Sequence, residues 1–295
     1  MTDGDAIPQA SYTAQGKERI RLWRNDMAEL AKDTGFLEAH SAALVQLMLY
    51  TLPFYQDLDS QRAVLATVRQ AVNNGTFLKT LAGALVKLDA AAVSRQECFM
   101  LLCWTAVVLR HLQPQSARKA VLRLVECQAV YLSRLQSSPA NKQNMLKVTD
   151  RLLAAKPDLL AAYVEVAKGT DSPGMMYAVL HFGSQHPQQI APYQQDLLRT
   201  YCDTILGAKT PPAAEKLDAY SPLLAQLSQE QFRSTVLPAA QKFVKRTPEA
   251  ALVSMKALFQ ALQLDLSSNI ADVAEQLVKL MRGSKESVRY EPLVT

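Results

Sequence analysis

The stretch Cys98–Leu109 constrains the fold of this chain more than any other. It reads CFMLLCWTAVVL, without a charge or a strong helix breaker, and Glu97 and Arg110 bound it. As an α-helix it would be about 18 Å long, whereas a membrane-spanning helix needs roughly 20 apolar residues. Because the stretch is apolar on every side, we expect a buried helix that neighbouring helices cover all round.

The rest of the chain has the composition and the periodicity of helices. Leu and Ala dominate, aromatic residues make up 7% and glycines number ten, a mixture that favours helix over strand. Apolar residues recur at three- and four-residue spacing in successive segments. Ser94 is a predicted N-cap, and Ser228 with Gln231 three residues later predicts a capping box. Representative predicted helices cover about 17–33, 39–50, 94–112, 115–136 and 157–168.

These helices predict an all-α, HEAT/armadillo-like α-solenoid of about seven helical hairpins. About fourteen helices with short links give roughly 42 residues per pair, the repeat length of such hairpins. An irregular all-α domain is the alternative, but a compact bundle would need several helices that are apolar all round, and we find one. The predicted organisation is a polar N-terminal tail over 1–16, the solenoid over 17–282, and a C-terminal tail over 283–295, interpreted as the truncation of a longer array with an apolar edge near Ile270–Met281.

Motifs for catalysis or for cofactor binding are missing from the sequence. Cys98, Cys103, Cys127 and Cys202 have no paired spacing, so we expect buried free thiols in a reducing compartment. The polar, acidic N-terminus is not a signal peptide, which indicates a cytoplasmic chain. No phosphate loop, dinucleotide fingerprint, nucleophile elbow or zinc-ligand spacing occurs. We therefore predict no enzyme activity, no catalytic residue, no cofactor, no metal and no small-molecule substrate.

Basic residues gather in three predicted helices, and two of these clusters supply the candidate contact residues. One interpretation is a solvated face whose charge complements the helix dipole, and the other is a contact surface for an RNA-rich or acidic partner. Aromatic residues do not interleave with these clusters, so stacking on single-stranded bases is not expected. The candidate contact residues are Arg118, Lys119, Arg123, Lys242, Lys245 and Arg246.

Several blocks, taken in order, resemble one protein family. The family is the general-control translational activator, a very large HEAT-repeat coactivator of the kinase that phosphorylates the alpha subunit of initiation factor two. No single block is specific to this family, but the order and spacing of the blocks over roughly 17–289 are. The blocks are Glu97–Pro114, Leu124–Gln128, the run from Tyr220–Leu224 to Leu237-Pro238, Thr247–Glu249 and Leu262–Ser267.

The resemblance implies an α-solenoid that associates with ribosomes and helps to relay amino-acid starvation or ribosome stalling to the kinase. The ribosome is then the expected partner, through ribosomal RNA or acidic stalk proteins. The sites for the kinase and for an ATP-binding-cassette partner are expected outside this chain, and neither a membrane nor DNA is an expected partner. The alternative function is a HEAT or armadillo adaptor, or a transport-receptor-like scaffold, that binds protein partners.

Overall fold

The computed structural model describes residues 14–89, 92–135, 139–244 and 246–265, together with the single positions 267, 271, 274, 275 and 278. Every regular element in this described part is a helix. The predicted all-α, solenoid-like class is therefore confirmed, whereas the predicted edge at Ile270–Met281 and the tail over 283–295 lie largely or wholly outside the described residues. The chain divides into two compact units, Met1–Val166 and Ala167–Thr295, and each is described by itself.

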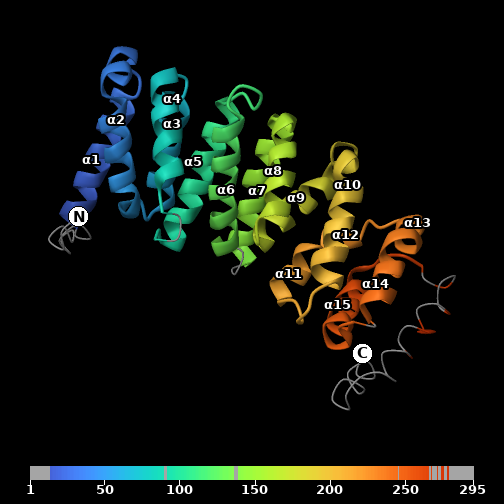
Figure 1. Cartoon of the computed structure of the whole chain (residues 1–295). Helices are drawn as coiled ribbons and strands as arrows, with labels where there is room; N and C mark the ends of the chain where they lie inside the picture. Colours follow the sequence, from blue (N-terminus) through green and yellow to red (C-terminus); the bar gives the residue numbers. More distant parts are fainter. Residues whose placement is uncertain are drawn as a thin grey trace. The chain divides into compact units, whose positions relative to one another are not determined.

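The first unit consists of two rows of helices (Figure 1). In one row α1, α3, α5 and α7 each pack against the next, and in the other α2 packs on α4 and α4 on α6. Because α5 contacts both α4 and α6, the rows share one core. The helices of this unit are α1 (Ala14–Leu30), α2 (Thr34–Thr51), the short 3₁₀ helix η2 (Leu52–Phe54), α3 (Leu58–Ala71), α4 (Gly75–Lys87), α5 (Arg95–His111), α6 (Arg118–Leu135), α7 (Pro139–Ala155), the 3₁₀ helix η3 (Pro157–Leu159) and most of α8 (Leu160–Gly169).

Helix α5 contains the long apolar stretch and lies at the centre of the first unit. It packs against α3, α4, α6 and α7, and the side chain of Trp104 has no exposed surface. Within Cys98–Leu109, Phe99 and Val107 are half-buried and every other residue is buried. The prediction that neighbouring helices cover this stretch on all sides is confirmed.

Both ends of α5 have partners for their free backbone groups. At the N-terminus the Ser94 hydroxyl accepts from the Glu97 N–H at 3.3 Å, and the Glu97 carboxylate accepts from the Ser94 N–H at 2.6 Å. At the other end the Lys156 ammonium donates to the carbonyl of Arg110 at 3.1 Å and also to that of Leu112. These bonds fix where the buried helix begins and ends.

A buried polar chain joins three helices of the first unit. The Gln128 amide on α6 donates to the Thr105 hydroxyl on α5 at 2.9 Å. The Tyr163 hydroxyl on α8 in turn donates to the amide oxygen of Gln128. Gln128 is 1% exposed and Tyr163 has no exposed surface, so each group depends on the other for a hydrogen bond. Burial raises the pKa of Tyr163 far above its usual value, with the Gln128 bond acting in the opposite direction, so the hydroxyl stays protonated.

Replacing Tyr163 with Phe tests this chain of bonds. The change keeps the ring but leaves the amide oxygen of Gln128 buried without that donor, so we expect the free energy of unfolding to fall by about 1–2 kcal/mol. Tyr201→Phe is the matched control, because the Tyr201 hydroxyl is almost equally buried and has no hydrogen-bond partner among the described residues. Urea denaturation followed by circular dichroism should show no loss for the control, and equal losses in the two variants would contradict the assignment.

The second unit consists of shorter and less regular helices than the first. The last residues of α8 are followed by α9 (Pro173–Gln185), α10 (Pro187–Tyr201), the π-helical turn η4 (Cys202–Leu206), α11 (Ala214–Ala219), α12 (Ser221–Leu224), α13 (Gln229–Gln231), the π-helical turn η5 (Phe232–Val236), α14 (Leu237–Val244) and α15 (Pro248–Ala261). The predicted capping box at α13 is confirmed: the Ser228 hydroxyl accepts from the Gln231 N–H at 3.1 Å, and the Gln231 amide oxygen accepts from the Ser228 N–H at 3.0 Å.

The two π-helical turns pack against neighbouring helices through backbone carbonyls. In η4 the N–H of Gly207 donates to the carbonyl of Cys202 at 2.9 Å, the i to i+5 bond of a π turn. The buried hydroxyl of Ser254 on α15 donates to the carbonyl of Ile205 at 3.1 Å. The Cys202 thiol donates to the carbonyl oxygen of Thr235 in η5 at 4.0 Å. The carbonyls at these two turns thus have partners from other helices.

Candidate interaction surface

The predicted basic cluster on α6 is on the surface, but two of its three members are paired. Arg118 is 72% exposed and forms an ion pair with Glu165 of α8 at 2.9 Å. Arg123 is 62% exposed and pairs with Glu126 at 2.8 Å. Lys119 is exposed, and no carboxylate of the described residues pairs with it. The cluster therefore presents one unneutralised cation and two partly neutralised ones.

The second predicted cluster belongs to the second unit, at the end of α14. Lys242 is exposed, and its ammonium lies 5.4 Å from the centre of the Phe243 ring, a cation–π contact. Arg246 is also exposed, and Lys245 lies outside the described residues. Since the two clusters are in different units, each is a separate candidate surface.

A larger concentration of positive charge surrounds the first cluster in the sequence and extends beyond the predicted residues. Residues 61–156 contain fourteen lysines and arginines and four acidic residues, a net charge of +10, while the whole chain carries +5. Three exposed members were not among the predicted residues: Arg110 on α5 and Arg151 on α7, which both pack against α6, and Arg69 on α3, which packs against α5. A running sum of charge would have found this segment, whereas a search for local clusters did not.

The cysteines lack the properties of catalytic or metal-binding thiols. Cys98, Cys103 and Cys202 are buried, as predicted, and Cys127 is half-buried. Burial raises the pKa of both Cys103 and Cys202 to about 12, so little reactive thiolate exists at neutral pH. Within the described residues no three His, Cys, Asp or Glu side chains come together in a group that could hold a metal ion.

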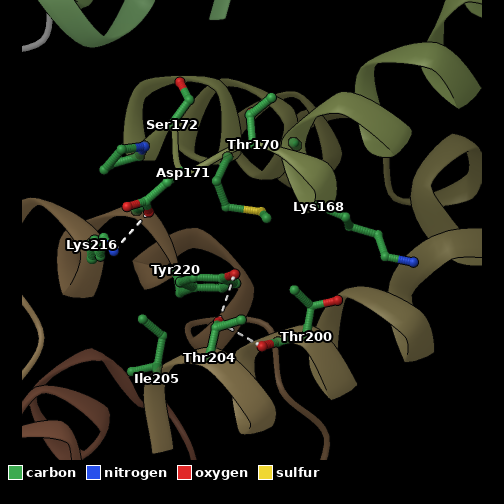
Figure 2. A pocket seen from close by; sticks show the side chains of 13 residues that line it. Lys168, Thr170, Asp171, Ser172, Thr200, Thr204, Ile205, Lys216 and Tyr220 are labelled. Atoms are coloured by element: carbon green, nitrogen blue, oxygen red, sulfur yellow. Dashed lines mark hydrogen bonds and ion pairs between the residues drawn. The ribbon is translucent and has the colours of Figure 1, made fainter. Parts of the chain in front are cut away.

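A small pocket lined by both polar and apolar side chains lies in the second unit between α9, α10 and α11 (Figure 2). At its wall Lys216 pairs with Asp171 at 2.7 Å, and Lys168 pairs with Asp196. The Tyr220 hydroxyl lies 3.4 Å from that of Thr204, and burial raises the pKa of Tyr220. The charged groups thus neutralise one another, and the sequence analysis had not predicted this pocket.

In the part of the chain that the structure describes, no helix combines the length and the hydrophobicity that crossing a bilayer requires.

Comparison with known proteins points to one family. Residues 194–294 match the family model described as the N-terminal region of stalled ribosome sensor GCN1. The chain is 26% identical over 285 residues to the protein ILITYHIA of Arabidopsis thaliana, and 25% identical over 305 residues to stalled ribosome sensor GCN1 of Homo sapiens. These alignments cover 93% and 96% of this chain but 11% of each relative, so the chain spans about a tenth of their length. No solved structure matches the chain.

The matched region includes the blocks on which the predicted resemblance rested most clearly. Tyr220–Leu224, Leu237-Pro238 and Leu262–Ser267 all fall within residues 194–294. The predicted resemblance is therefore confirmed: this chain is similar to the N-terminal region of stalled ribosome sensor GCN1.

Proposed function

We propose that this chain is a non-enzymatic helical scaffold that contacts the ribosome within a system that senses ribosome stalling. The observation that carries the proposal is the similarity of nearly the whole chain to proteins named stalled ribosome sensor. Rows of packed helices suit such a role, because they present an extended surface to which a large partner can bind.

The exposed cations supply a physical basis for contact with a ribosome. Lysines and arginines that meet RNA phosphates release condensed counterions, which makes binding strong at low salt and weak at high salt. Lys119, Lys242 and Arg246 are exposed, and Arg118 and Arg123 would exchange their surface ion pairs for phosphate contacts. Exposed ion pairs contribute only about 0–1 kcal/mol, so their exchange costs little.

The proposal extends to translational control. A longer protein that contains this segment would relay starvation or stalling to the initiation-factor-two kinase, and its kinase and ATP-binding-cassette sites would lie in other segments. The proposed location is the cytoplasm, where the ribosomes are.

Cosedimentation of charge-reversed variants with ribosomes tests the proposed contact. Reversal of all six candidate residues (Arg118, Lys119, Arg123, Lys242, Lys245 and Arg246) should lower the pelleted fraction at least fivefold at about 50 mM salt, since each change replaces attraction to phosphate by repulsion. Circular dichroism should show unchanged helix content, because all of the described members are on the surface.

The control reverses six exposed cations outside these clusters: Arg62, Lys87, Arg95, Arg199, Lys209 and Lys256. It has the same net charge as the test variant, so we expect a much smaller loss. Equal loss in the two variants would show that the six residues form no specific contact. If neither the variants nor the natural chain ever pelleted with ribosomes, a protein-binding adaptor would be the better account.

A further inference from the structure

Positive charge in this chain is segregated into one part of the first unit. Residues 61–156, which run from the first turn of α3 to the residue after α7, carry a net charge of +10, so all other residues together carry −5. The segment has four acidic residues, Asp89, Glu97, Glu126 and Asp150, and none lies between positions 98 and 125. Association with polyanions depends on such local fields more than on the net charge of a whole chain.

The structure brings part of this charge to the turn between α5 and α6. Arg110 is in the last turn of α5 and Lys119 is in the first turn of α6. The bond from Lys156 to the carbonyl of Arg110 places the end of α7 at the same edge. His111 at this turn has a lowered pKa, mainly through burial and further through Arg110 and Lys156, in keeping with a positive local field.

Neighbouring helices extend the positive edge on both sides of α5. Arg69 near the end of α3 is close enough to α5 to oppose, slightly, the effect of burial on the Cys103 thiol. Arg151 is on the C-terminal half of α7, little more than one helical turn before Lys156. We call Arg69, Arg110, Lys119 and Arg151 the basic edge; all four are exposed, and none pairs with a carboxylate of the described residues.

Helix stability alone does not account for this arrangement. Cations in the last turn of a helix, such as Arg69 and Arg110, interact favourably with the helix dipole, whereas cations in the first turn do not. Helix α6 nevertheless begins with Arg118 and Lys119 and has no acidic residue in its first turn. Glu165 compensates Arg118, and Lys119 stays uncompensated among the described residues. The dipole of α6 therefore does not account for the position of Lys119, whereas contact with an anion would.

We propose that the basic edge binds the phosphate backbone of folded RNA. This rests on the proposed ribosome contact and names the chemistry and the surface of that contact. A protein-binding surface would need apolar or aromatic anchors, and the large exposed apolar side chains of the described residues lie elsewhere: Leu22, Trp23, Leu30, Leu47, Tyr50, Leu58, Val130 and Val278. None of the exposed aromatic residues in this list lies at the α5–α6 turn, which also argues against base stacking there.

Fluorescence anisotropy with a labelled RNA hairpin tests the proposal. The variant changes Arg69, Arg110, Lys119 and Arg151 to Gln, which removes charge while retaining a good helix former. We expect the Kd at about 50 mM salt to rise at least tenfold. The slope of log Kd against log salt should fall by about 3, as expected for the loss of four phosphate contacts. The matched control changes Lys87, Arg95, Lys209 and Lys256 to Gln and should lose less than threefold.

The outcomes separate this inference from the proposed function. In one outcome the natural chain binds RNA weakly, the edge variant binds it equally weakly, and the chain still pellets with ribosomes. That result would overturn RNA binding by the basic edge and leave the proposed ribosome contact intact. Tighter binding of a poly-glutamate peptide than of RNA to the natural chain would overturn it in favour of an acidic protein partner. RNA binding that falls in the edge variant, together with loss from ribosome pellets, is the expected result.

Discussion

Replacement of Trp104 by Ala should lower the free energy of unfolding by about 3–5 kcal/mol, the usual cost of deleting a buried aromatic side chain. The Trp104 side chain has no exposed surface and lies in the middle of α5, which four other α-helices and the 3₁₀ helix η2 contact. The cavity would thus affect both helix rows of the first unit. Urea denaturation followed by far-ultraviolet circular dichroism measures the loss without depending on the deleted fluorophore.

The chain contains a matched control for this experiment. Trp23 on α1 is 46% exposed, so Trp23→Ala should change the free energy of unfolding by no more than about 0.5 kcal/mol. Trp104→Phe adds a second comparison: in the part of the chain that the structure describes, the indole N–H of Trp104 has no hydrogen-bond partner, so this variant should lose much less than Trp104→Ala. A Trp104→Ala protein as stable as the natural chain would contradict the claim that α5 is covered on all sides.

Replacement of Gly207 by Ala should destabilise the second unit by up to about 3 kcal/mol, the upper part of the usual range for overpacking. A Cβ atom at this position would lie 2.6 Å from the carbonyl oxygen of Asp203 and 2.9 Å from the Phe243 ring. Because one of these neighbours is backbone, relief requires a change in the π-helical turn η4 itself. The measurement is the shift of the urea midpoint.

Gly83→Ala is the opposite case. A Cβ atom there meets nothing within 4 Å, and the residue lies inside α4, so Ala should stabilise the chain by about 0.5–1 kcal/mol. Opposite signs for the two glycines would support the close packing of η4 on α14. A neutral or stabilising Gly207→Ala would show that the turn is not packed as described.

Signals that involve only residues close together in the sequence predicted the helix ends well. The predicted N-cap at Ser94 and the predicted capping box at Ser228 both form, because each needs only residues three positions apart. Asn-Gly pairs and prolines are local signals of the same kind, and helices begin at Gly75, Pro157 and Pro173. The apolar stretch in α5 predicted its own burial, since no amphipathic face was available for solvent.

Features that depend on distant residues were not predictable in the same way. The π-helical turns at Cys202–Leu206 and Phe232–Val236 have partners on other helices, such as Ser254, and a helical apolar period does not reveal them. Helix α11 is six residues long and follows two prolines, too short for a periodic signal. The pairing of Arg118 with Glu165, 47 positions away, likewise depends on the packing of α6 against α8.

The candidate surface was predictable only in part for the same reason. Clustering along the sequence identified Lys119, but Arg69, Arg110 and Arg151 are isolated in sequence and come close to one edge only when α3, α5 and α7 pack together.

The distribution of the purified chain in a sucrose gradient with added ribosomes tests the central claim most directly. At about 50 mM salt the chain should travel with the ribosomal fractions, and at about 500 mM salt most of it should stay at the top, as counterion release requires. A chain that stays at the top of the gradient at both salt concentrations would contradict ribosome contact by this segment.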